Sequence, residues 1–256
     1  MSRVMIALNS DTGESFGNFR VGNDEELMKF ISSANIACGF HAGDPVVMAH
    51  TVRLAKEHGV SIGAHPGYPD LMGFGRRKMG VAPEEMRDYI VYQIGALKAF
   101  VESEGLQLQH VWLHGALQSA AGKDESMAKA IVEGIRSVDP KLIMASRPSL
   151  LSYKMAEKAG LRTAVFVGVD LEYDRDGMPV IQRKKKATDP KEAAGKAVKI
   201  AKEGRLTATT GEEIDMRANA ILVHGDTPNA IDVLKEIRRE FARQDIEVVP
   251  LGRMFS

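Results

Sequence analysis

Five residues that can bind protons or metal ions each follow a short apolar segment of the sequence. The apolar segments are 4–8, 34–38, 60–64, 111–113 and 221–223, and the residues that follow them are Asp11, His41, His65, His114 and His224. Carboxylates and imidazoles act as general acids and bases near neutral pH, and they also bind zinc-like ions. Because reacting groups in α/β barrels lie just beyond the carboxyl ends of buried parallel strands, the pattern predicts one shared site.

The segments between these apolar runs have the spacing and end signals of helices. Asp44 and Pro45 begin one that ends at Gly59, and Pro83 begins a longer amphipathic one that ends at Gly105. Further helices are predicted at 124–136, 149–159, 190–203 and 228–243. More apolar runs at 141–145, 162–169 and 246–251 bring the number of candidate strands to about eight. This alternation favours a single β/α barrel domain over residues 1–256. An open doubly wound sheet is the alternative, but its glycine-rich fingerprint does not follow the first strand.

The composition narrows the class of partner. The 256 residues are 44% hydrophobic, enough for one large core, and 34 basic residues balance 34 acidic ones. Zero net charge argues against nucleic acid and anionic membranes as partners. The basic run at 183–186 has no interleaved aromatics and is predicted to be a solvated loop. A single cysteine, the absence of a leader pattern and the absence of an apolar stretch of about 18 residues predict a cytoplasmic protein without a membrane segment.

Two carboxylates stand three residues apart in the first candidate segment. Asp11 and Glu14 could act as a base, as metal ligands or as an ammonium clamp, although both could instead cap turns. The same segment contains Gly13, Ser15 and Gly17, which match the G-x-S-x-G nucleophile elbow. A glycine-containing loop rather than a helix is predicted after Ser15, so a serine nucleophile is disfavoured.

The next two segments are loops rich in glycine. His41 follows the second strand between two glycines, where the backbone can approach a ligand closely, and Asp44 is either a helix cap or part of the site. Residues 62–77 form a long loop of the kind that makes lids or binding surfaces. In that loop, Arg76 or Arg77 could receive a carboxylate or phosphate, and the other is expected to be solvated.

These segments carry a resemblance to a known family. Residues 9–17, 33–45 and 62–77, together with His114-Gly115-Ala116-Leu117 and the stretch 223–226, closely resemble the LamB/YcsF family, the A subunits of 5-oxoprolinase. The similarity covers essentially the whole chain. It implies an irregular seven-stranded β/α barrel, similar to the glycoside hydrolase and deacetylase barrels and one strand smaller than the count above.

The resemblance also implies an activity, the ATP-dependent opening of the lactam 5-oxoproline to L-glutamate together with two companion subunits. An unstrained amide is a poor electrophile, and phosphorylation of its carbonyl oxygen would let water attack more readily. Because the chain lacks a G-x-x-x-x-G-K-[ST] loop, ATP is expected to bind mainly to the partners or at a shared surface.

The candidate roles follow from this chemistry. Asp11 or His65 would be the base that activates water, and His41, His114 or His224 would protonate the leaving nitrogen or steady the oxyanion. Candidate substrate-binding groups lie on the same and neighbouring segments: Asn9, Glu14, Asn35, Arg76, Arg77, Asp170 and Asp226. The alternative is a divalent metal held by Asp11 and two or three histidines, as in a deacetylase or amidase.

The sequence departs from the family pattern in two places. Trp112-Leu113 precede the His114 motif where members carry Lys-Pro, and Gln118 follows it in place of a tyrosine. The segment 166–173 keeps Asp170 and Tyr173 but lacks the family's glutamate and arginine. Because this lysine and this arginine are missing, the substrate could be 5-oxoproline or another lactam. A further alternative is a subunit that has lost its activity and only binds the lactam. The sequence also leaves four questions open: whether a metal is bound, which residue is the acid and which the base, what the oligomeric state is, and which subunit binds ATP.

Overall fold

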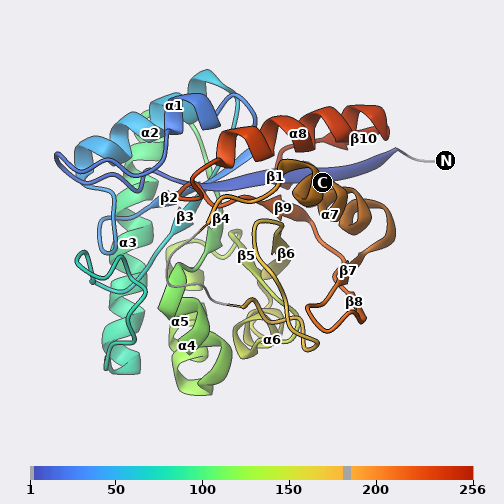
Figure 1. The fold of residues 1–256 in the computed structure, drawn as a ribbon. Coiled ribbons are helices and arrows are strands. Elements are labelled where there is room, and N and C mark those ends of the chain that lie inside the picture. The colour runs from blue at the N-terminus through green and yellow to red at the C-terminus, as the bar shows by residue number, and fades with distance from the viewer. Residues whose placement is uncertain (1–2, 181–185, 256) are drawn as a thin grey trace. The chain divides into compact units, whose positions relative to one another are not determined.

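A computed structural model describes residues 3–180 and 186–255 of the chain (Figure 1). The parallel strands are β1 (Val4–Thr12), β2 (Ser33–Ala37), β3 (Ser61–His65), β4 (Leu108–Trp112), β5 (Ile143–Ser146), β6 (Arg162–Gly168), β9 (Ala220–Leu222) and β10 (Ile246–Val248). The helices are α1 (Asp24–Leu27), α2 (Pro45–Glu57), α3 (Pro83–Ser103), α4 (Gly115–Lys123), α5 (Glu125–Val138), α6 (Leu151–Lys158), α7 (Pro190–Glu203) and α8 (Ala230–Arg243).

The strand order confirms the predicted fold class. Seven strands follow the order β1-β2-β3-β4-β5-β6-β9, and β9 also pairs with β1, which is the topology of an irregular seven-stranded β/α barrel. All eight apolar runs identified in the sequence form strands. The eighth strand, β10, pairs in parallel with β1 through Val4 and Ile246. It lies outside the seven strands of the barrel and explains why eight strands were counted in the sequence.

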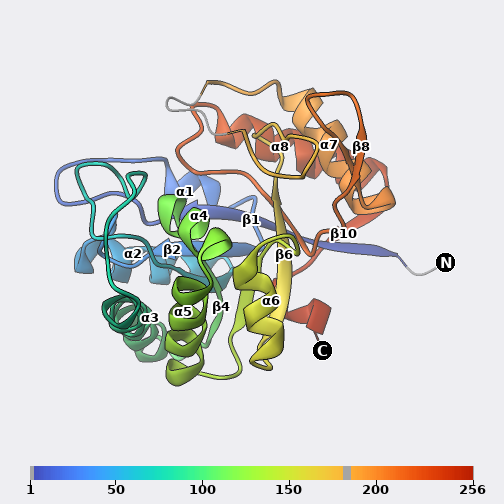
Figure 2. The ribbon, with the colours of Figure 1, turned by 90° about the horizontal axis from the view of Figure 1, so that it is seen from below.

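Two compact units make up the chain, and the boundary between them falls within β1, β2 and β6. The first unit comprises residues 1–10, 22–33 and 165–256; in it β10, β1, β9 and β6 are consecutive neighbours. Helices α7 and α8 of this unit pack against each other (Figure 1). The second unit comprises residues 11–21 and 34–164 and contains β2 from Ala34 onward together with β3, β4 and β5. Its helices α3, α5 and α6 lie in succession, with α4 against α5 (Figure 2).

Local sequence signals account for most helix boundaries. Asp44 accepts hydrogen bonds from the amides of Val46 and Val47 and so caps α2, and Asp189 caps α7 in the same way ahead of Pro190. Helices α1 and α4, the short helix η1 (Leu251–Phe255) and the antiparallel pair β7 (Arg205–Thr207) and β8 (Glu213–Asp215) were not predicted. The elements α1, α4, β7 and β8 are short and lack a long periodic pattern.

Three sequence predictions stand apart from the strand and helix assignments. The basic run at 183–186 falls mostly outside the described residues, and the single domain over residues 1–256 stays a prediction. No helix in the described ranges combines the length and the apolar character that a membrane crossing requires.

Candidate active site

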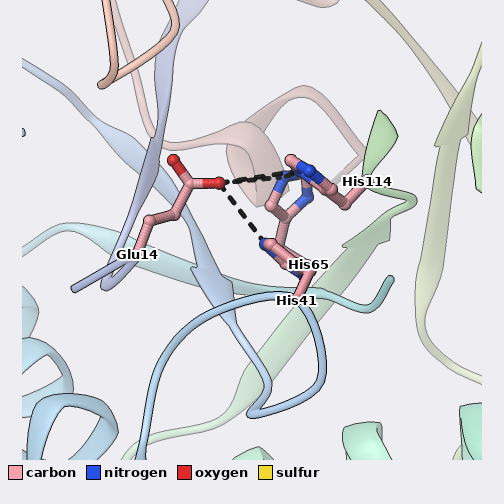
Figure 3. A group of neighbouring side chains, drawn as sticks. All are labelled: Glu14, His41, His65 and His114. Atoms are coloured by element: carbon pink, nitrogen blue, oxygen red, sulfur yellow. Dashed lines mark hydrogen bonds and ion pairs between the residues drawn. The ribbon is translucent and has the colours of Figure 1, made fainter. Parts of the chain in front are cut away.

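Four buried side chains of the second unit converge on one point (Figure 3). Glu14 follows β1, His41 lies in the loop after β2, His65 is the last residue of β3, and His114 precedes α4 directly. One potential ligand atom from each lies within 4.8 Å of every other. Each side chain is at most 5% exposed. The chain therefore places one carboxylate and three imidazoles together in a site shielded from water.

Backbone carbonyls fix the orientation of two of the imidazoles. The Nδ1 atom of His65 lies 2.7 Å from the carbonyl oxygen of Trp112, and Nε2 of His114 lies 2.8 Å from that of Phe74. Because a carbonyl oxygen only accepts, each of these ring nitrogens carries the hydrogen. The other nitrogens, Nε2 of His65 and Nδ1 of His114, face each other at 2.9 Å. When both rings are neutral, these two nitrogens therefore carry lone pairs that face each other.

The Glu14 carboxylate lies opposite these nitrogens, as Figure 3 shows. Its Oε1 atom is 3.4 Å from Nε2 of His41, 3.6 Å from Nδ1 of His114 and 4.0 Å from Nε2 of His65. The ring of His41 stacks on that of His114 with 3.8 Å between centroids and 3° between planes. Neither ring nitrogen of His41 has a hydrogen-bond partner among the described residues, although both are buried.

A second carboxylate approaches the cluster through a chain of buried polar groups. Oδ1 of Asp11 lies 3.6 Å from Nε2 of His65 and accepts a 2.8 Å hydrogen bond from the side-chain amide of Asn35. The Asn35 carbonyl oxygen lies 2.8 Å from Nε2 of His110, which must therefore be the donor. This chain of bonds fixes which oxygen of Asp11 faces His65. Asp11 lies within β1 rather than beyond it, because β1 continues through the buried residues Asn9 to Thr12.

The loop after β3 packs tightly over the histidines. A Cβ on Gly67 would lie 2.6 Å from Nδ1 of His41, and one on Gly75 would lie 2.7 Å from Cδ2 of His114 and 2.8 Å from Cβ of His41. Gly75 also has a φ of +62°, a conformation that suits glycine. The side chain of Gln93 on α3 holds Gly67 through both the amide and the carbonyl of its backbone. These glycines let the backbone approach the imidazoles closely.

The two arginines of this loop have different environments. Arg77 donates to both carboxylate oxygens of the buried Asp70, so it stabilises the loop internally. The Arg76 guanidinium lies 5.0 Å from the ring centre of Phe74 and contributes to lowering the pKa of His41 and His114. Its charge therefore acts on the cluster, and Arg76 is the better candidate of the two for contact with an anionic ligand.

Burial dominates the electrostatics of these histidines. It lowers the pKa of His41 and of His114 well below the ordinary value of 6.5, and neighbouring imidazole and guanidinium charges lower it further. Burial also lowers the pKa of His110 to about 3. His41, His114 and His110 are therefore neutral in the physiological range, the form in which an imidazole can accept a proton or bind a metal.

The first unit holds the remaining predicted residues. His224 lies beyond β9, and its Nδ1 is 2.9 Å from Oδ1 of Asp170, whose other oxygen accepts a 2.6 Å hydrogen bond from Thr227. Asn9 donates to Ser33 at 3.1 Å. Asp226 belongs to the same unit and follows β9. Within the second unit, the structure brings together six of the predicted residues: Asp11, Glu14, Asn35, His41, His65 and His114. Within the first unit, His224 and Asp170 form a hydrogen-bonded pair.

Two alternative interpretations of the sequence are resolved by hydrogen bonding. Ser15 Oγ accepts from the amide of Val21 at 3.0 Å, and a turn rather than a helix follows it, as expected for a loop residue and not for a nucleophile elbow. Asp44 has one oxygen on the α2 amides and the other 2.7 Å from the amide of Gly17. It is a helix cap that also anchors the first loop.

His110 and Gln93 take part in the site but were missed in the sequence. The apolar run at 111–113 was predicted as the strand, whereas β4 begins at Leu108 and includes His110. A histidine two positions before Trp112 in a buried strand was the available signal, because alternate residues of a strand share a face.

Comparisons with known proteins identify relatives over nearly the full length of the chain. The model of the LamB/YcsF family matches residues 6–256. The chain is 51% identical to a 5-oxoprolinase A subunit of Thermococcus onnurineus, over 97% of this chain and 98% of the relative. It is 46% identical to one from Clostridium beijerinckii, over 98% and 99% of the respective lengths. The solved structure of a lactam utilization protein from Thermus thermophilus superimposes with a TM-score of 0.90 at 42% identity, over 96% of this chain and 99% of that one.

Proposed function

Because the chain belongs to the LamB/YcsF family, we propose that it is the hydrolytic subunit of an ATP-dependent enzyme that opens a lactam ring. The substrate would be 5-oxoproline, which gives L-glutamate, or a related lactam. Two companion subunits would complete the enzyme, and the ATP-binding site would lie mainly on these subunits or at a surface that they share with this chain. The cytoplasm is the expected compartment. Relatives named as the A subunits of 5-oxoprolinase support this assignment over nearly the full length of the chain.

The observation that carries the proposal is the buried contact between Asp11 and His65, whose ring in turn faces that of His114. Lactam opening needs a base to take a proton from water and an acid to give one to the ring nitrogen. Nε2 of His65 carries no hydrogen in the neutral ring, is held in place through Trp112, and lies 3.6 Å from the Asp11 carboxylate. It can therefore accept a proton from water, and the carboxylate stabilises the imidazolium that forms.

His114 supplies a path for that proton. Its Nδ1 lies 2.9 Å from Nε2 of His65, so a proton taken by one ring can pass to the other. In the reaction, water adds to the carbonyl carbon after its oxygen has received the phosphoryl group of ATP. The bond from carbon to the ring nitrogen then breaks, and the nitrogen takes the proton from the histidine pair, which leaves an acyl phosphate. A second water hydrolyses this acyl phosphate to the carboxylate and inorganic phosphate. Arg76 would receive the substrate carboxylate or the phosphoryl group.

Turnover by the reconstituted enzyme tests this proposal. The chain is combined with the two companion subunits of a 5-oxoprolinase, with and without ATP, and glutamate is measured by chromatography. Asp11→Asn and His65→Gln should each lower kcat at least about 100-fold, the usual range for a lost general base. The matched control is His50→Gln, an exposed histidine on α2 of the same unit, which should keep full activity.

Two results would contradict the proposal. Full turnover by both Asp11→Asn and His65→Gln would show that neither acts as the base. Thermal stabilisation by 5-oxoproline without turnover in the complete, ATP-supplied assembly would favour a lactam-binding subunit that has lost its activity. A lactam without a carboxylate, such as 2-pyrrolidinone, separates the two roles of Arg76. If Arg76 binds the substrate carboxylate, Arg76→Ala should raise KM for 5-oxoproline only; impaired turnover of both lactams would assign Arg76 to the phosphoryl group.

A further inference from the structure

We propose that Glu14, His41, His65 and His114 form a binding site for one divalent metal ion of the zinc class. The proposal takes this cluster as the reacting site and in that respect rests on the proposed function. With an ion bound to Nε2 of His65 and Nδ1 of His114, Asp11 rather than His65 would be the base that takes the proton from water. Its test measures binding rather than turnover, so that the two can fail separately.

The facing nitrogens of His65 and His114 are the first argument. A neutral imidazole carries one N–H group. His65 donates its N–H to the backbone carbonyl of Trp112, and His114 donates its N–H to that of Phe74. The remaining nitrogens lie 2.9 Å apart, a separation at which two lone pairs repel unless a positive charge lies between or beside them. A metal ion bound by both nitrogens, or a shared proton, removes this repulsion.

His41 favours the metal over the proton. A single shared proton satisfies the pair formed by His65 and His114 and leaves the third imidazole unexplained. His41 is buried, and its two ring nitrogens have no hydrogen-bond partner within the described ranges, which is unfavourable for a buried polar group. Its Nε2 lies 3.4 Å from Oε1 of Glu14, beside the facing pair. A cation at this point would use that nitrogen as well.

The carboxylates supply the charge that a cation needs. Oε1 of Glu14 lies within 4.0 Å of a nitrogen of each of the three histidines, and Asp11 approaches His65 from the same side. Three imidazoles and a carboxylate are the nitrogen and oxygen donors that zinc accepts. Glu14 rather than Asp11 is the carboxylate of this group, which differs from the ligand set considered from sequence.

The surroundings have the features that metal sites share. Histidine ligands of metals usually donate their second ring nitrogen to a carbonyl or carboxylate, which fixes the ring, and both His65 and His114 do so. Gly67 and Gly75 pack the loop backbone directly against His41 and His114, so the rings have little freedom to turn away. Such an ion would polarise a carbonyl or phosphoryl oxygen of the substrate.

Metal titration of the full chain tests the site. Protein stripped with a chelator is titrated with Zn²⁺ by calorimetry and with Co²⁺ by visible absorption, which reports nitrogen and oxygen coordination directly. One ion per chain is expected. Glu14→Gln and His114→Gln should each weaken binding at least about 10-fold, and more for the histidine, while circular dichroism shows a retained fold. His50→Gln and His58→Gln, exposed histidines on α2 and at its end, serve as matched controls and should bind like the unchanged protein.

Three outcomes would overturn the proposal. Binding of less than about a tenth of an equivalent would assign the facing nitrogens to a shared proton. Equal affinity of Glu14→Gln, His114→Gln and the unchanged protein would place any bound ion elsewhere on the chain. Loss of binding in the His50→Gln control would identify a surface site. If a ligand variant does not fold, the Co²⁺ spectrum of the unchanged protein decides, since it must show nitrogen ligands.

Discussion

Replacing Gly63 by alanine is the sharpest test of how the fold supports the site. Gly63 on β3 lies opposite His110 on β4 in the parallel register, and the His110 ring lies across it. A Cβ at Gly63 would be 2.1 Å from Nε2, 2.2 Å from Cδ2 and 2.4 Å from Cε1 of that ring. All three distances are far inside van der Waals contact, and the buried ring cannot flex away as the end of a long side chain would.

The expected cost follows from two terms. Forcing an extra methyl group into a packed core costs about 1–3 kcal/mol. Moving the ring also breaks the 2.8 Å hydrogen bond between His110 and Asn35, which leaves buried polar groups unsatisfied at about 1–3 kcal/mol. Gly63→Ala should therefore lower the free energy of unfolding by about 2–6 kcal/mol, a large part of the total of a typical domain.

Urea denaturation of a double-mutant cycle measures this cost and its origin. In the His110→Ala background the ring is absent, so Gly63→Ala should cost less than about 1 kcal/mol there. Gly95→Ala is the control, because Gly95 lies inside α3 with no atom within 4 Å of a new Cβ; it should be neutral or stabilise by up to about 1 kcal/mol. Equal costs of Gly63→Ala with and without the His110 ring would refute the reasoning.

Two further predictions follow from buried titratable groups. The pKa of His110 is about 3 in the folded chain against 6.5 ordinarily, so the unfolded chain binds the extra proton between these values, and stability is lost as pH falls from about 6.5 toward 3. Denaturant curves at pH 7, 6 and 5 should show a loss of up to about 1.4 kcal/mol per pH unit from this residue; a slope unchanged in His110→Gln would contradict it. Burial raises the pKa of the Cys38 thiol to about 12, so a thiol reagent should leave the native protein unmodified and label it only after denaturation. Prompt labelling under native conditions would contradict this prediction and show that the segment around Cys38, directly after β2, opens.

The strand and helix pattern is the part of the fold that could be predicted from the sequence. Apolar runs and the caps Asp44 and Asp189 are local signals, and they predicted all eight parallel strands and six of the eight α-helices in the described ranges. Helices α1 and α4 and the β7–β8 pair were missed because they have little periodic pattern of their own. The family motifs supplied the closure at seven strands, which depends on the pairing of β1 with β9 and therefore on contacts between distant parts of the chain.

The candidate site shows the same division more sharply. Residue types and their positions near strand ends selected Asp11, His41, His65, His114 and His224 from the sequence, because parallel strands end at a common edge. The first four lie in the second unit, although Asp11 is inside β1, and His224 lies in the first unit. Which carboxylate faces the imidazoles was decided only by the tertiary structure, which brings Glu14 within 4.0 Å of a nitrogen of all three. The protonated nitrogens of His65 and His114 were also decided there, because the backbone carbonyls of Trp112 and Phe74 accept their hydrogens. Every residue type carries such a carbonyl, so the sequence holds no signal for it. The amino-acid sequence determines which chemical groups are available, and long-range packing sets their distances and orientations, on which acid, base and metal chemistry depend.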